Sequence, residues 1–292
     1  MEAKIKTLFI VNPFSGLGRQ KRIEGHIQKV LDGERFDYRV VYTERPHHAT
    51  RLCEEAIKDA YQLIVAVGGD GTVNEVARPL AGTKVAMGII PSGSGNGLAR
   101  HLKISTNPAQ AIAVINKMHQ RKIDTVKVND RLFVSIAGVG FDAYIAKKYA
   151  GQKKRGFTKY AMLSIQNYFA YKPKKYHLTV DGRTLKRRAL FISIANSDQF
   201  GYNTSIAPNA KIDDGLVDVC IMKKVPWFKT VILAPLLFSQ NLHRSSYLEI
   251  IRAREVEIYQ KKKRINLDGE SVKLGQKLHF EVWPLSLIVV TP

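Results

Sequence analysis

Residues 63–75 read LIVAVGGDGTVNE, and their types and spacing suit the binding of an anion beside a carboxylate. The apolar run from Leu63 to Val67 is rich in β-branched side chains, which predicts a strand buried on both faces. Three glycines around Asp70 follow it, and then a helix start. Backbone N–H groups and the positive end of a helix dipole attract phosphate. The stretch therefore predicts a phosphate-binding turn with an acid inside it.

Asp70 leaves two interpretations open. A carboxylate beside phosphate is repulsive unless a divalent cation screens the pair or the acid works on a proton. The alternative is a tight turn in which Asp70 caps backbone groups. The phosphate site is favoured because the glycines follow a strand, at the sheet edge where open α/β sheets bind ligands. This turn has neither Gly-Lys-Ser/Thr nor G-x-G-x-x-G spacing, so the two better-known phosphate loops are excluded.

The helix after this turn is predicted to begin at Thr72, because Thr72 and Glu75 have the spacing of a capping box. Similar units of a strand and a helix lie around it. Strands are expected at 7–11, 38–42 and 85–90, with helices that begin near Ile23, Ala49 and Pro108. Four such units in succession predict a parallel α/β sheet, in which the turns after the strands meet at one edge. Turns at 12–16, 43, 68–74 and 93–96 are expected to converge there.

Beyond Asp124 strands dominate. Hairpins are predicted at 176–180 with Asp181-Gly182, and at 255–259 leading to 265–267 with Asp268-Gly269. Further strands are expected at 126–128, 132–137, 189–195, 216–222 and 278–283, with one helical insertion around 159–169. The predicted fold is a Rossmann-like α/β ATP-binding domain over 1–125, which 285–292 could complete, and a mainly antiparallel β-sandwich domain for a lipid substrate over 126–284.

The charge of the chain is uneven. The 292 residues are 45% hydrophobic, enough for two domains with cores, and Lys and Arg exceed Asp and Glu by 21. Residues 1–125 hold 18 basic and 12 acidic residues, and residues 126–292 hold 28 and 13. The basic residues cluster, for example at 153–155, 172–175 and 261–264. Such a surface attracts nucleic acid or an anionic membrane, or is a solvated face.

Targeting and metal signals are few. The N-terminus passes from charged residues into a strand without a secretory apolar segment, so a cytoplasmic location is expected. The apolar stretch at 231–238 is interrupted by Pro235 and is too short to span a bilayer. Residues 226–242 fit a core helix, a hinge or an interfacial helix, and a core position is favoured. Cys53 and Cys220 form neither a disulfide framework nor a zinc site, and Cys53 is expected on an apolar helix face.

Several turns together resemble one family. Gly68-Gly69-Asp70-Gly71-Thr72, with Asn12-Pro13-Phe14-Ser15-Gly16 before it and Pro91-Ser92-Gly93-Ser94-Gly95-Asn96 after it, resembles the catalytic domain of diacylglycerol and sphingosine kinases. The compact bacterial lipid kinases of that family are the more particular resemblance, which continues through 138–142, Ala207-Pro208, 213–218 and Asp268-Gly269-Glu270. It implies transfer of the γ-phosphoryl group of ATP to the hydroxyl of a lipid.

The resemblance also implies roles for single residues. Glu270 would be the general base that takes the proton of the substrate hydroxyl, Asp70 would position catalytic Mg²⁺ or share that role, and Asp124 would be a supporting acid. A structural Mg²⁺ would be held by Asp214 and the carbonyls of Lys211 and Leu216, with waters completing the octahedron. Nucleotide contacts would come from Asn12, Pro13, Phe14, Ser15, Gly16, Thr43, Gly68, Gly69, Asp70, Gly71, Thr72, Val73, Asn74 and Ser94.

The substrate and the partners stay open at this point. Gly97 stands where diacylglycerol kinases of the family usually carry Asp and where sphingosine and ceramide kinases tend to have a small residue. Diacylglycerol, a sphingoid base and ceramide are therefore all candidates. The lipid is expected at an anionic membrane, with the protein peripheral at its inner face, no specific nucleic acid bound and a homodimer left open. The alternatives are an NAD kinase-like soluble kinase and a non-enzymatic basic nucleic-acid-binding protein.

Overall fold

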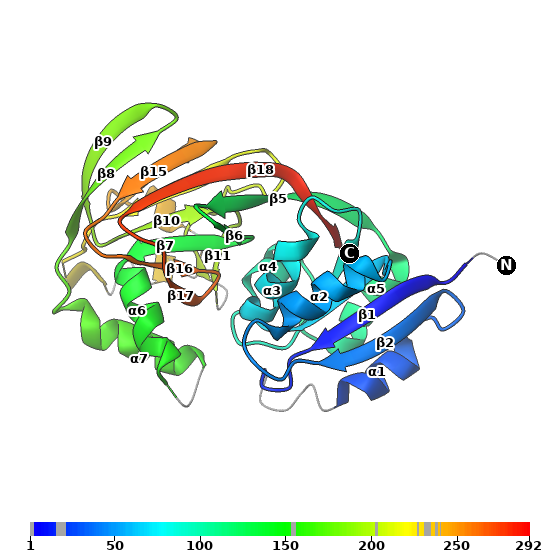
Figure 1. Cartoon of the computed structure of the whole chain (residues 1–292). Coiled ribbons are helices and arrows are strands. Elements are labelled where there is room, and N and C mark those ends of the chain that lie inside the picture. Colours follow the sequence, from blue (N-terminus) through cyan, green and yellow to red (C-terminus); the bar gives the residue numbers. More distant parts are fainter. Residues whose placement is uncertain are drawn as a thin grey trace. The chain divides into compact units, whose positions relative to one another are not determined.

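The computed structural model describes residues 3–15, 22–152, 156–201, 204–226, 228–230, 235–236, 239 and 241–292. The chain divides into two compact units: unit 1 is Met1–Ile123 with Leu285–Pro292, and unit 2 is Asp124–Pro284. The chain enters unit 2 within strand β5 (Gln120–Val128) and returns to unit 1 within strand β18 (Lys277–Val290) (Figure 1). The predicted basic cluster at 153–155 and the predicted site residue Gly16 lie outside the described residues.

Unit 1 is built on parallel strands in the order β2-β1-β3-β4, and the end of β18 lies beside β4, with Val289 opposite Met87. This confirms the predicted parallel α/β fold with its four strand–helix units. The elements are β1 (Ile5–Val11), α1 (Ile23–Val30), β2 (Phe36–Tyr42), α2 (His48–Lys58), β3 (Leu63–Gly68), α3 (Asp70–Leu80), β4 (Ala86–Pro91), α4 (Gly97–His101) and α5 (Pro108–Lys117).

The helices of unit 1 cover its central strands. Every residue of β3 and β4 is buried, as expected for strands with helices on both faces. Helix α1 contacts α5, and α2 contacts α3. Cys53 lies on the buried face of α2, as predicted. Helix α5 also begins as its sequence indicates, because the Asn107 side chain accepts from the N–H groups of Ala109 and Gln110 at 2.9 and 3.3 Å.

Unit 2 is a β-sandwich, which confirms the predicted architecture. One sheet is antiparallel in the order β14-β13-β10-β7-β16-β17, and β5, β6, β8, β9, β15 and part of β18 form the other. Both sheets contribute to one apolar core, with Val139 and Ile194 from the first and Leu178 and Phe280 from the second. The remaining elements are β6 (Arg131–Phe133), β7 (Ile136–Gly140), α6 (Phe141–Ala150), α7 (Phe157–Tyr168), β8 (Lys174–Val180), β9 (Arg183–Ala189), β10 (Phe191–Ala195), β11 (Gln199–Gly201), β12 (Thr204–Ser205), β13 (Val217–Met222), η2 (Leu242–Arg244), β14 (Leu248–Ala253), β15 (Glu255–Tyr259), β16 (Arg264–Leu267) and β17 (Glu270–Lys273).

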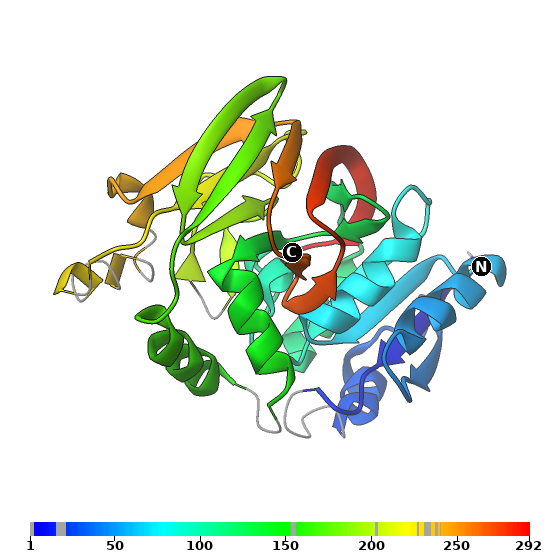
Figure 2. The ribbon, with the colours of Figure 1, turned by 60° about the vertical axis from the view of Figure 1, so that its left-hand side comes forward.

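Two helices, α6 and α7, lie side by side at one rim of unit 2 (Figure 2). Helix α6 contacts β7, β10, β16 and β17 as well as α7. Phe141, Ile145 and Leu190 are buried there, with Tyr160 and Tyr168 packed around them. Helix α7 confirms the predicted insertion, whereas α6 was not predicted. In the described part of the chain, none of the helices has the length and apolar character that crossing a bilayer requires.

Four predictions were wrong in detail. The strand expected at 132–137 is the end of β6 followed by the start of β7, which belong to different sheets. Helix α3 begins at Asp70 rather than Thr72, because the Glu75 carboxylate accepts from the N–H groups of His47 and Ala49 and so caps α2 instead of its own helix. The strand expected at 189–195 is the end of β9 followed by β10, which belong to different sheets. Strand β15 pairs with β8 and β18 rather than with β16.

The segment at 226–242 is described only in part. Leu236 and Leu242 pack against an apolar cluster on the outer side of the antiparallel sheet, in agreement with the favoured core position. Phe228 is exposed instead. The segment therefore contributes to the core with its C-terminal part.

Candidate active site

Two glycine-rich turns of unit 1 touch each other. The Ser92 N–H, after β4, donates to the Gly68 carbonyl at the end of β3 at 2.8 Å. A Cβ atom added to Gly93 would lie 2.5 Å from the Cα atom of Gly69, so no side chain fits between the turns. The N-cap residue of the following helix α3 is Gly69, which has no side chain that could cap the helix. The N-terminus of α3 therefore offers backbone N–H groups to an anion.

Asp70 joins the two turns. Its Oδ1 atom accepts from the Gly97 N–H at 2.6 Å and its Oδ2 atom from the Asn96 N–H at 2.9 Å, so the carboxylate caps helix α4. Burial raises the pKa of Asp70, and the hydrogen bonds from Gly97 and Asn96 act against that rise. A Cβ atom on Gly95 would lie 2.6 Å from Asp70 Oδ2, which leaves glycine as the residue that fits there. Asp70 thus has the backbone-capping role that the sequence left as an alternative.

The turn after β1 lies against the same two turns. The Asn12 side chain donates to Thr72 Oγ1 at 3.1 Å and accepts from the Phe14 N–H at 2.9 Å. The Ser15 and Ser92 hydroxyl groups lie 2.7 Å apart. These contacts link residues 60 and 77 positions apart in the chain. The three turns therefore converge at the carboxyl edge of the sheet.

In unit 2, Asp124 positions the loop before β13. Its side chain is fully buried, its Oδ2 atom accepts from the Gly215 N–H at 2.7 Å, and its own N–H donates to the Ile212 carbonyl at 2.7 Å. Asn196 donates to the Asp124 carbonyl at 2.9 Å. Asp124 therefore acts on the loop at 212–215 rather than facing solvent.

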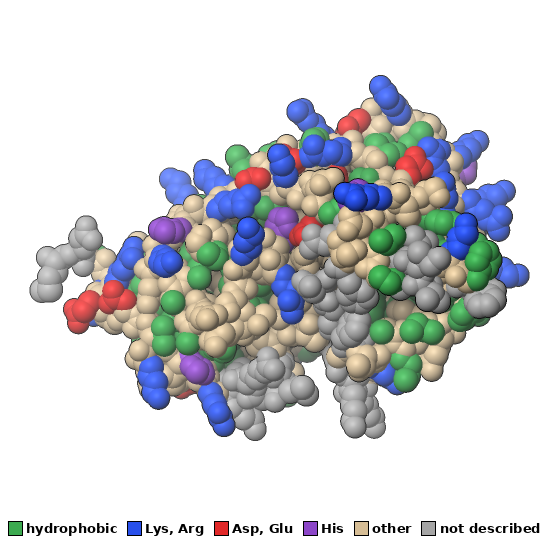
Figure 3. Space-filling view, turned by 180° about the vertical axis from the view of Figure 1, so that it is seen from behind, with side chains coloured by type: hydrophobic (Ala, Val, Ile, Leu, Met, Phe, Trp, Pro, Cys, Tyr) green, Lys and Arg blue, Asp and Glu red, His purple; other side chains and the backbone are tan. Residues whose placement is uncertain are grey.

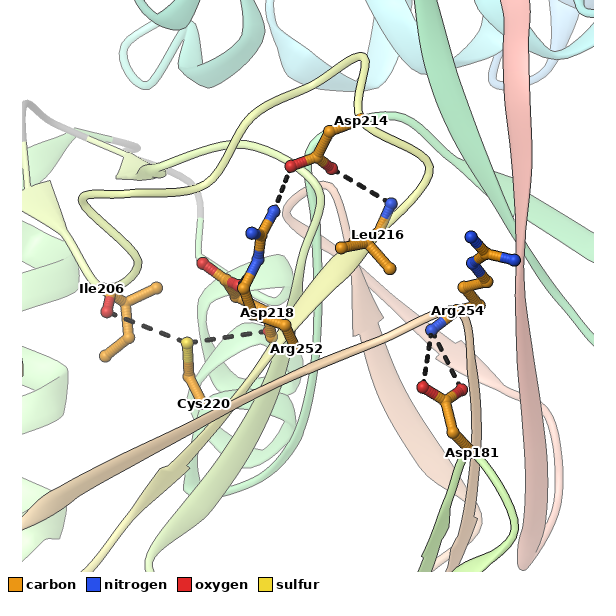
Figure 4. A network of polar contacts seen from close by, with 8 residues as sticks. All are labelled: Asp181, Ile206, Asp214, Leu216, Asp218, Cys220, Arg252 and Arg254. Atoms are coloured by element: carbon orange, nitrogen blue, oxygen red, sulfur yellow. Dashed lines mark hydrogen bonds and ion pairs between the residues drawn. The ribbon is translucent and has the colours of Figure 1, made fainter.

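The same loop carries Asp214, whose carboxylate already has a cationic partner. Its Oδ1 atom accepts from the Leu216 N–H at 3.1 Å, and its Oδ2 atom is paired with Arg252 Nη2. Arg252 Nε also lies 3.5 Å from Asp218 Oδ1, so the guanidinium group lies between two carboxylates (Figure 4). Each oxygen of Asp214 thus has one partner, and Arg252 supplies a positive charge at this carboxylate. In the described residues, no group of three or more His, Cys, Asp or Glu side chains is arranged to hold a metal ion.

Glu270 lies at the start of β17, just past the turn that joins β16 to β17. Its side chain is exposed, whereas Asp268 in the turn is buried. The Asp268 carboxylate accepts three backbone N–H groups at 2.9 Å, from Val134, Ser135 and Ile136. The turn that presents Glu270 is thus fixed to the residues that precede and begin β7.

Comparison with known proteins assigns the chain to a family. The diacylglycerol kinase catalytic domain matches residues 6–128, and a domain described as the YegS C-terminal NAD kinase beta sandwich-like domain matches 135–291. A Pseudomonas aeruginosa protein named "Probable lipid kinase YegS-like" is 32% identical over 252 residues, which cover 84% of this chain and 81% of that protein. The chain belongs to the diacylglycerol kinase catalytic-domain family. The predicted family and enzyme class, a kinase, are thereby confirmed.

Other members of the diacylglycerol kinase catalytic-domain family agree with this assignment. A diacylglycerol kinase of Bacillus subtilis strain 168 is 26% identical over 268 residues, with 89% of this chain and 88% of that protein covered. The crystal structure of a diacylglycerol kinase from Bacillus anthracis strain Sterne covers 100% of this chain and 99% of its own, with a TM-score of 0.79 and 24% identity. That likeness shows the shared fold. Membership of a kinase family implies that ATP is the phosphoryl donor.

The remaining residues that resemble nucleotide contacts of the diacylglycerol kinase catalytic-domain family differ in exposure. Phe14 and Ser94 are exposed, Pro13, Gly69 and Gly71 are half-buried, and Thr43, Gly68, Val73 and Asn74 are buried. The Thr43 N–H donates to the Val11 carbonyl at 2.9 Å, which fixes the end of β2 beside β1. Lys211 is exposed and Leu216 half-buried on the loop next to Asp214. Their roles in binding stay predictions.

Sequence reasoning did not assign roles to three residues that organise these sites in this family member. Asp268 was interpreted as part of a hairpin and of the motif that ends at Glu270, Arg252 was not considered, and Asp142 appeared in a motif without a role. Asp142 is buried and accepts from Asn266 Nδ2 at 3.1 and 3.0 Å. The signal for Asp268 and Asp142 was an acid inside a glycine-containing motif, and their partners more than 120 residues away were not visible.

Proposed function

We propose that the chain transfers the γ-phosphoryl group of ATP to the hydroxyl group of a lipid alcohol such as diacylglycerol, a sphingoid base or ceramide. The observation that carries the proposal is the match of both units to the domains of one kinase family, whose relatives described above are named lipid or diacylglycerol kinases. The joined glycine-rich turns of unit 1 support it, because they form a backbone edge suited to phosphate.

In the proposed reaction the lipid oxygen forms a bond to the γ-phosphorus while the bond from that phosphorus to the β–γ bridging oxygen breaks. ADP leaves with that oxygen, and Glu270 accepts the proton of the lipid hydroxyl. Such transfer depends mainly on positioning and on stabilisation of charge. The residues around Asn12, Gly68 to Asn74 and Ser94 would hold the phosphates. Asp70 would act as a positioning residue, because its carboxylate joins two turns by accepting the N–H groups of Asn96 and Gly97.

Magnesium is part of the proposal only as the ion that accompanies ATP, where it would neutralise charge on the phosphate oxygens. A structural magnesium at Lys211, Asp214 and Leu216 competes with Arg252 for Asp214. Thermal melting with and without magnesium decides between them. If Arg252 replaces the metal, the wild-type chain melts at one temperature in both buffers, and Arg252→Met makes melting magnesium-dependent. The opposite outcome is that magnesium raises the melting temperature of the wild-type chain and that Asp214→Ala abolishes this rise. That result would support the structural magnesium site.

Transfer of label from γ-labelled ATP tests the reaction on a panel of acceptors. The panel contains diacylglycerol, monoacylglycerol, sphingosine and ceramide in anionic mixed micelles, and NAD as a soluble acceptor. Labelled lipid supports the proposal and names the substrate class. Label on NAD alone would move the function to a soluble kinase, and no label on any acceptor would contradict a kinase of this substrate range.

Asp70→Asn serves as the loss-of-function variant, because one of its two backbone N–H donors would then face an amide NH₂. The matched control is Asp181→Asn. The Asp181 Oδ1 atom also accepts two backbone N–H groups, from Arg254 at 3.1 Å (Figure 4) and from Glu255 at 3.0 Å, but Asp181 lies in the β8–β9 turn. Labelled lipid should disappear with Asp70→Asn and persist with Asp181→Asn. Equal effects would mean that the loss reflects folding.

A further inference from the structure

Helix α7 exposes three large apolar side chains to solvent, with Gln166 exposed beside them. Met162 and Ile165 on the helix and Phe169 at its C-terminal cap are 52%, 64% and 62% exposed. Their spacing of three and four residues places them on one side of the helix. Leu163 is buried on the inner side. A helix on a protein surface normally presents polar residues outward, so these three residues, the α7 stripe, need a partner.

Tyrosines and lysines surround the α7 stripe. Lys148 Nζ donates to Asn167 Oδ1 at 2.7 Å and lies 5.0 Å from the Tyr144 ring. Lys224 Nζ donates to the carbonyls of Phe169 and Tyr171 at 3.0 and 2.9 Å, at the C-terminal end of α7. Further lysines follow at Lys172, Lys174 and Lys175, and residues 157–175 contain no acidic residue. The α7 stripe is therefore apolar with a cationic, aromatic border.

This combination fits an anionic lipid bilayer. Tyrosine and lysine are typical of the membrane–water interface, where the ring or the aliphatic stem is buried and the polar end meets headgroups. Lysines near the surface are attracted to anionic lipids. Figure 3 shows the molecule from behind, where Lys and Arg side chains outnumber Asp and Glu side chains, as they do in the whole chain. A nucleic acid would use the charge but would leave the methionine, isoleucine and phenylalanine exposed.

We propose that the α7 stripe inserts into the interfacial region of an anionic bilayer, with the surrounding lysines on lipid phosphates. The stripe would thereby hold the enzyme at the surface that contains its substrate. The biological purpose rests on the proposed lipid kinase function, but the binding itself needs neither ATP nor turnover.

A fluorophore attached at Ile165 tests insertion directly. Cys53 and Cys220 are both buried, so the variant Ile165→Cys can be labelled selectively with a probe sensitive to polarity. The matched control is Tyr259→Cys on β15, at a residue that is 52% exposed. With vesicles of phosphatidylglycerol and phosphatidylcholine, emission from position 165 should shift to shorter wavelength and that from position 259 should not. No shift at 165, or equal shifts at both positions, would overturn the proposal.

Sedimentation with the same vesicles measures the energetic share of the stripe. Ile165→Ser/Phe169→Ser should weaken binding about 100-fold, since two apolar side chains lose their burial. Lys172→Ala should weaken it about fivefold, and Tyr259→Ser should have no effect. Pure phosphatidylcholine vesicles should bind the wild-type chain much more weakly. Vesicle binding that the double variant retains would contradict insertion of the stripe.

Two further measurements distinguish membrane insertion of the stripe from the proposed kinase function and from self-association of the chain. The double variant should still phosphorylate a short-chain, water-soluble form of the lipid that the panel identifies. A chain that binds vesicles through the stripe but transfers no phosphate would refute the proposed function alone. Light scattering without vesicles tests whether a second copy of the chain covers the stripe. If the wild type is a dimer and the double variant is a monomer, self-association replaces membrane insertion as the function of the stripe.

Discussion

Two hairpins of unit 2 have the same turn and differ in what the turn presents. Asp181-Gly182 joins β8 to β9, and Asp268-Gly269 joins β16 to β17. The two aspartates have φ angles of 44° and 45°, and the two glycines have φ angles of 80° and 90°. Positive φ at both central residues is the geometry that Asp-Gly pairs favour in two-residue hairpins. The backbone therefore does not distinguish the two turns.

The two hairpins differ in the burial of the aspartate that anchors each turn, and in the residue that follows the glycine. Asp181 is exposed and accepts two backbone N–H groups, whereas Asp268 is buried and accepts three. After the glycine the first hairpin carries Arg183 and the second carries Glu270. A generic turn thus becomes a candidate catalytic element through burial of its anchor and one acidic residue.

The largest expected effect concerns the residue after each glycine. Glu270→Gln should lower turnover by roughly 10²- to 10⁴-fold if Glu270 is the general base, because an amide cannot accept the substrate proton. Arg183→Gln, at the matching position of the other hairpin, should leave turnover unchanged. Steady-state phosphorylation of the lipid measures both. Near-normal turnover of a folded Glu270→Gln variant would remove Glu270 from that role.

The second prediction uses a buried acid beside the β16–β17 hairpin. Burial raises the pKa of Asp142 to about 6, although hydrogen bonds from Asn266 and Tyr160 lower it. The folded state then binds a proton that the unfolded state has released, so the contribution of Asp142 to stability is complete below pH about 4 and is lost as the pH rises through about 6. The loss amounts to about 3 kcal/mol.

Urea unfolding at several pH values measures this linkage. Asp142→Asn has no titrating group, so its stability relative to wild type should increase between pH about 4 and about 6 and then stay level. If the difference in free energy of unfolding between the wild type and Asp142→Asn does not vary with pH, the pKa of Asp142 is not raised.

The parts of the molecule that sequence predicted are those with local signals. The apolar run at 63–67 and the glycines after it predicted β3 and its turn, because burial on both faces selects apolar residues and the crowded positions in the turn select glycine. The start of α3 was wrong because Glu75 bonds to α2, a choice between two nearby helices that spacing cannot reveal. Likewise, β15 has partners in β8 and β18 that its sequence neighbours do not indicate.

In the candidate site, too, the sequence revealed the residues that lie in local motifs but not the contacts between distant residues. Asn12, Asp70 and Glu270 were found from motifs, but the contacts that fix their surroundings join distant residues. Asp268 bonds to residues 132 to 134 positions away, and Arg252 pairs with Asp214 over 38 positions. Such pairings depend on the register of strands, which the hydrophobic pattern of one strand does not define.

The third prediction tests the anchors. Asp268→Asn should destabilise the chain by about 1.5–3 kcal/mol, because the buried Val134 N–H loses its charged acceptor and faces an amide NH₂. Asp181→Asn should cost about 0.5 kcal/mol or less, since water can replace an exposed partner. Asparagine tolerates the left-handed backbone as aspartate does, so the turns themselves are preserved. Chemical denaturation of both variants measures the difference, and equal losses would show that burial of the anchor is unimportant.

The smallest expected effect tests the claim that the backbones are equivalent. Gly269→Ala and Gly182→Ala should each destabilise by about 1–2 kcal/mol, because a Cβ atom is disfavoured at positive φ. A Cβ atom at either position would have no neighbour within 4 Å, so sterics of the surroundings add nothing to either loss. The two losses should therefore agree, and Gly269→Ala should lower turnover only as far as it moves Glu270. A clearly larger loss at Gly269 would mean that the second turn is coupled to its buried anchor, and the two hairpins would then differ in backbone as well as in side chains.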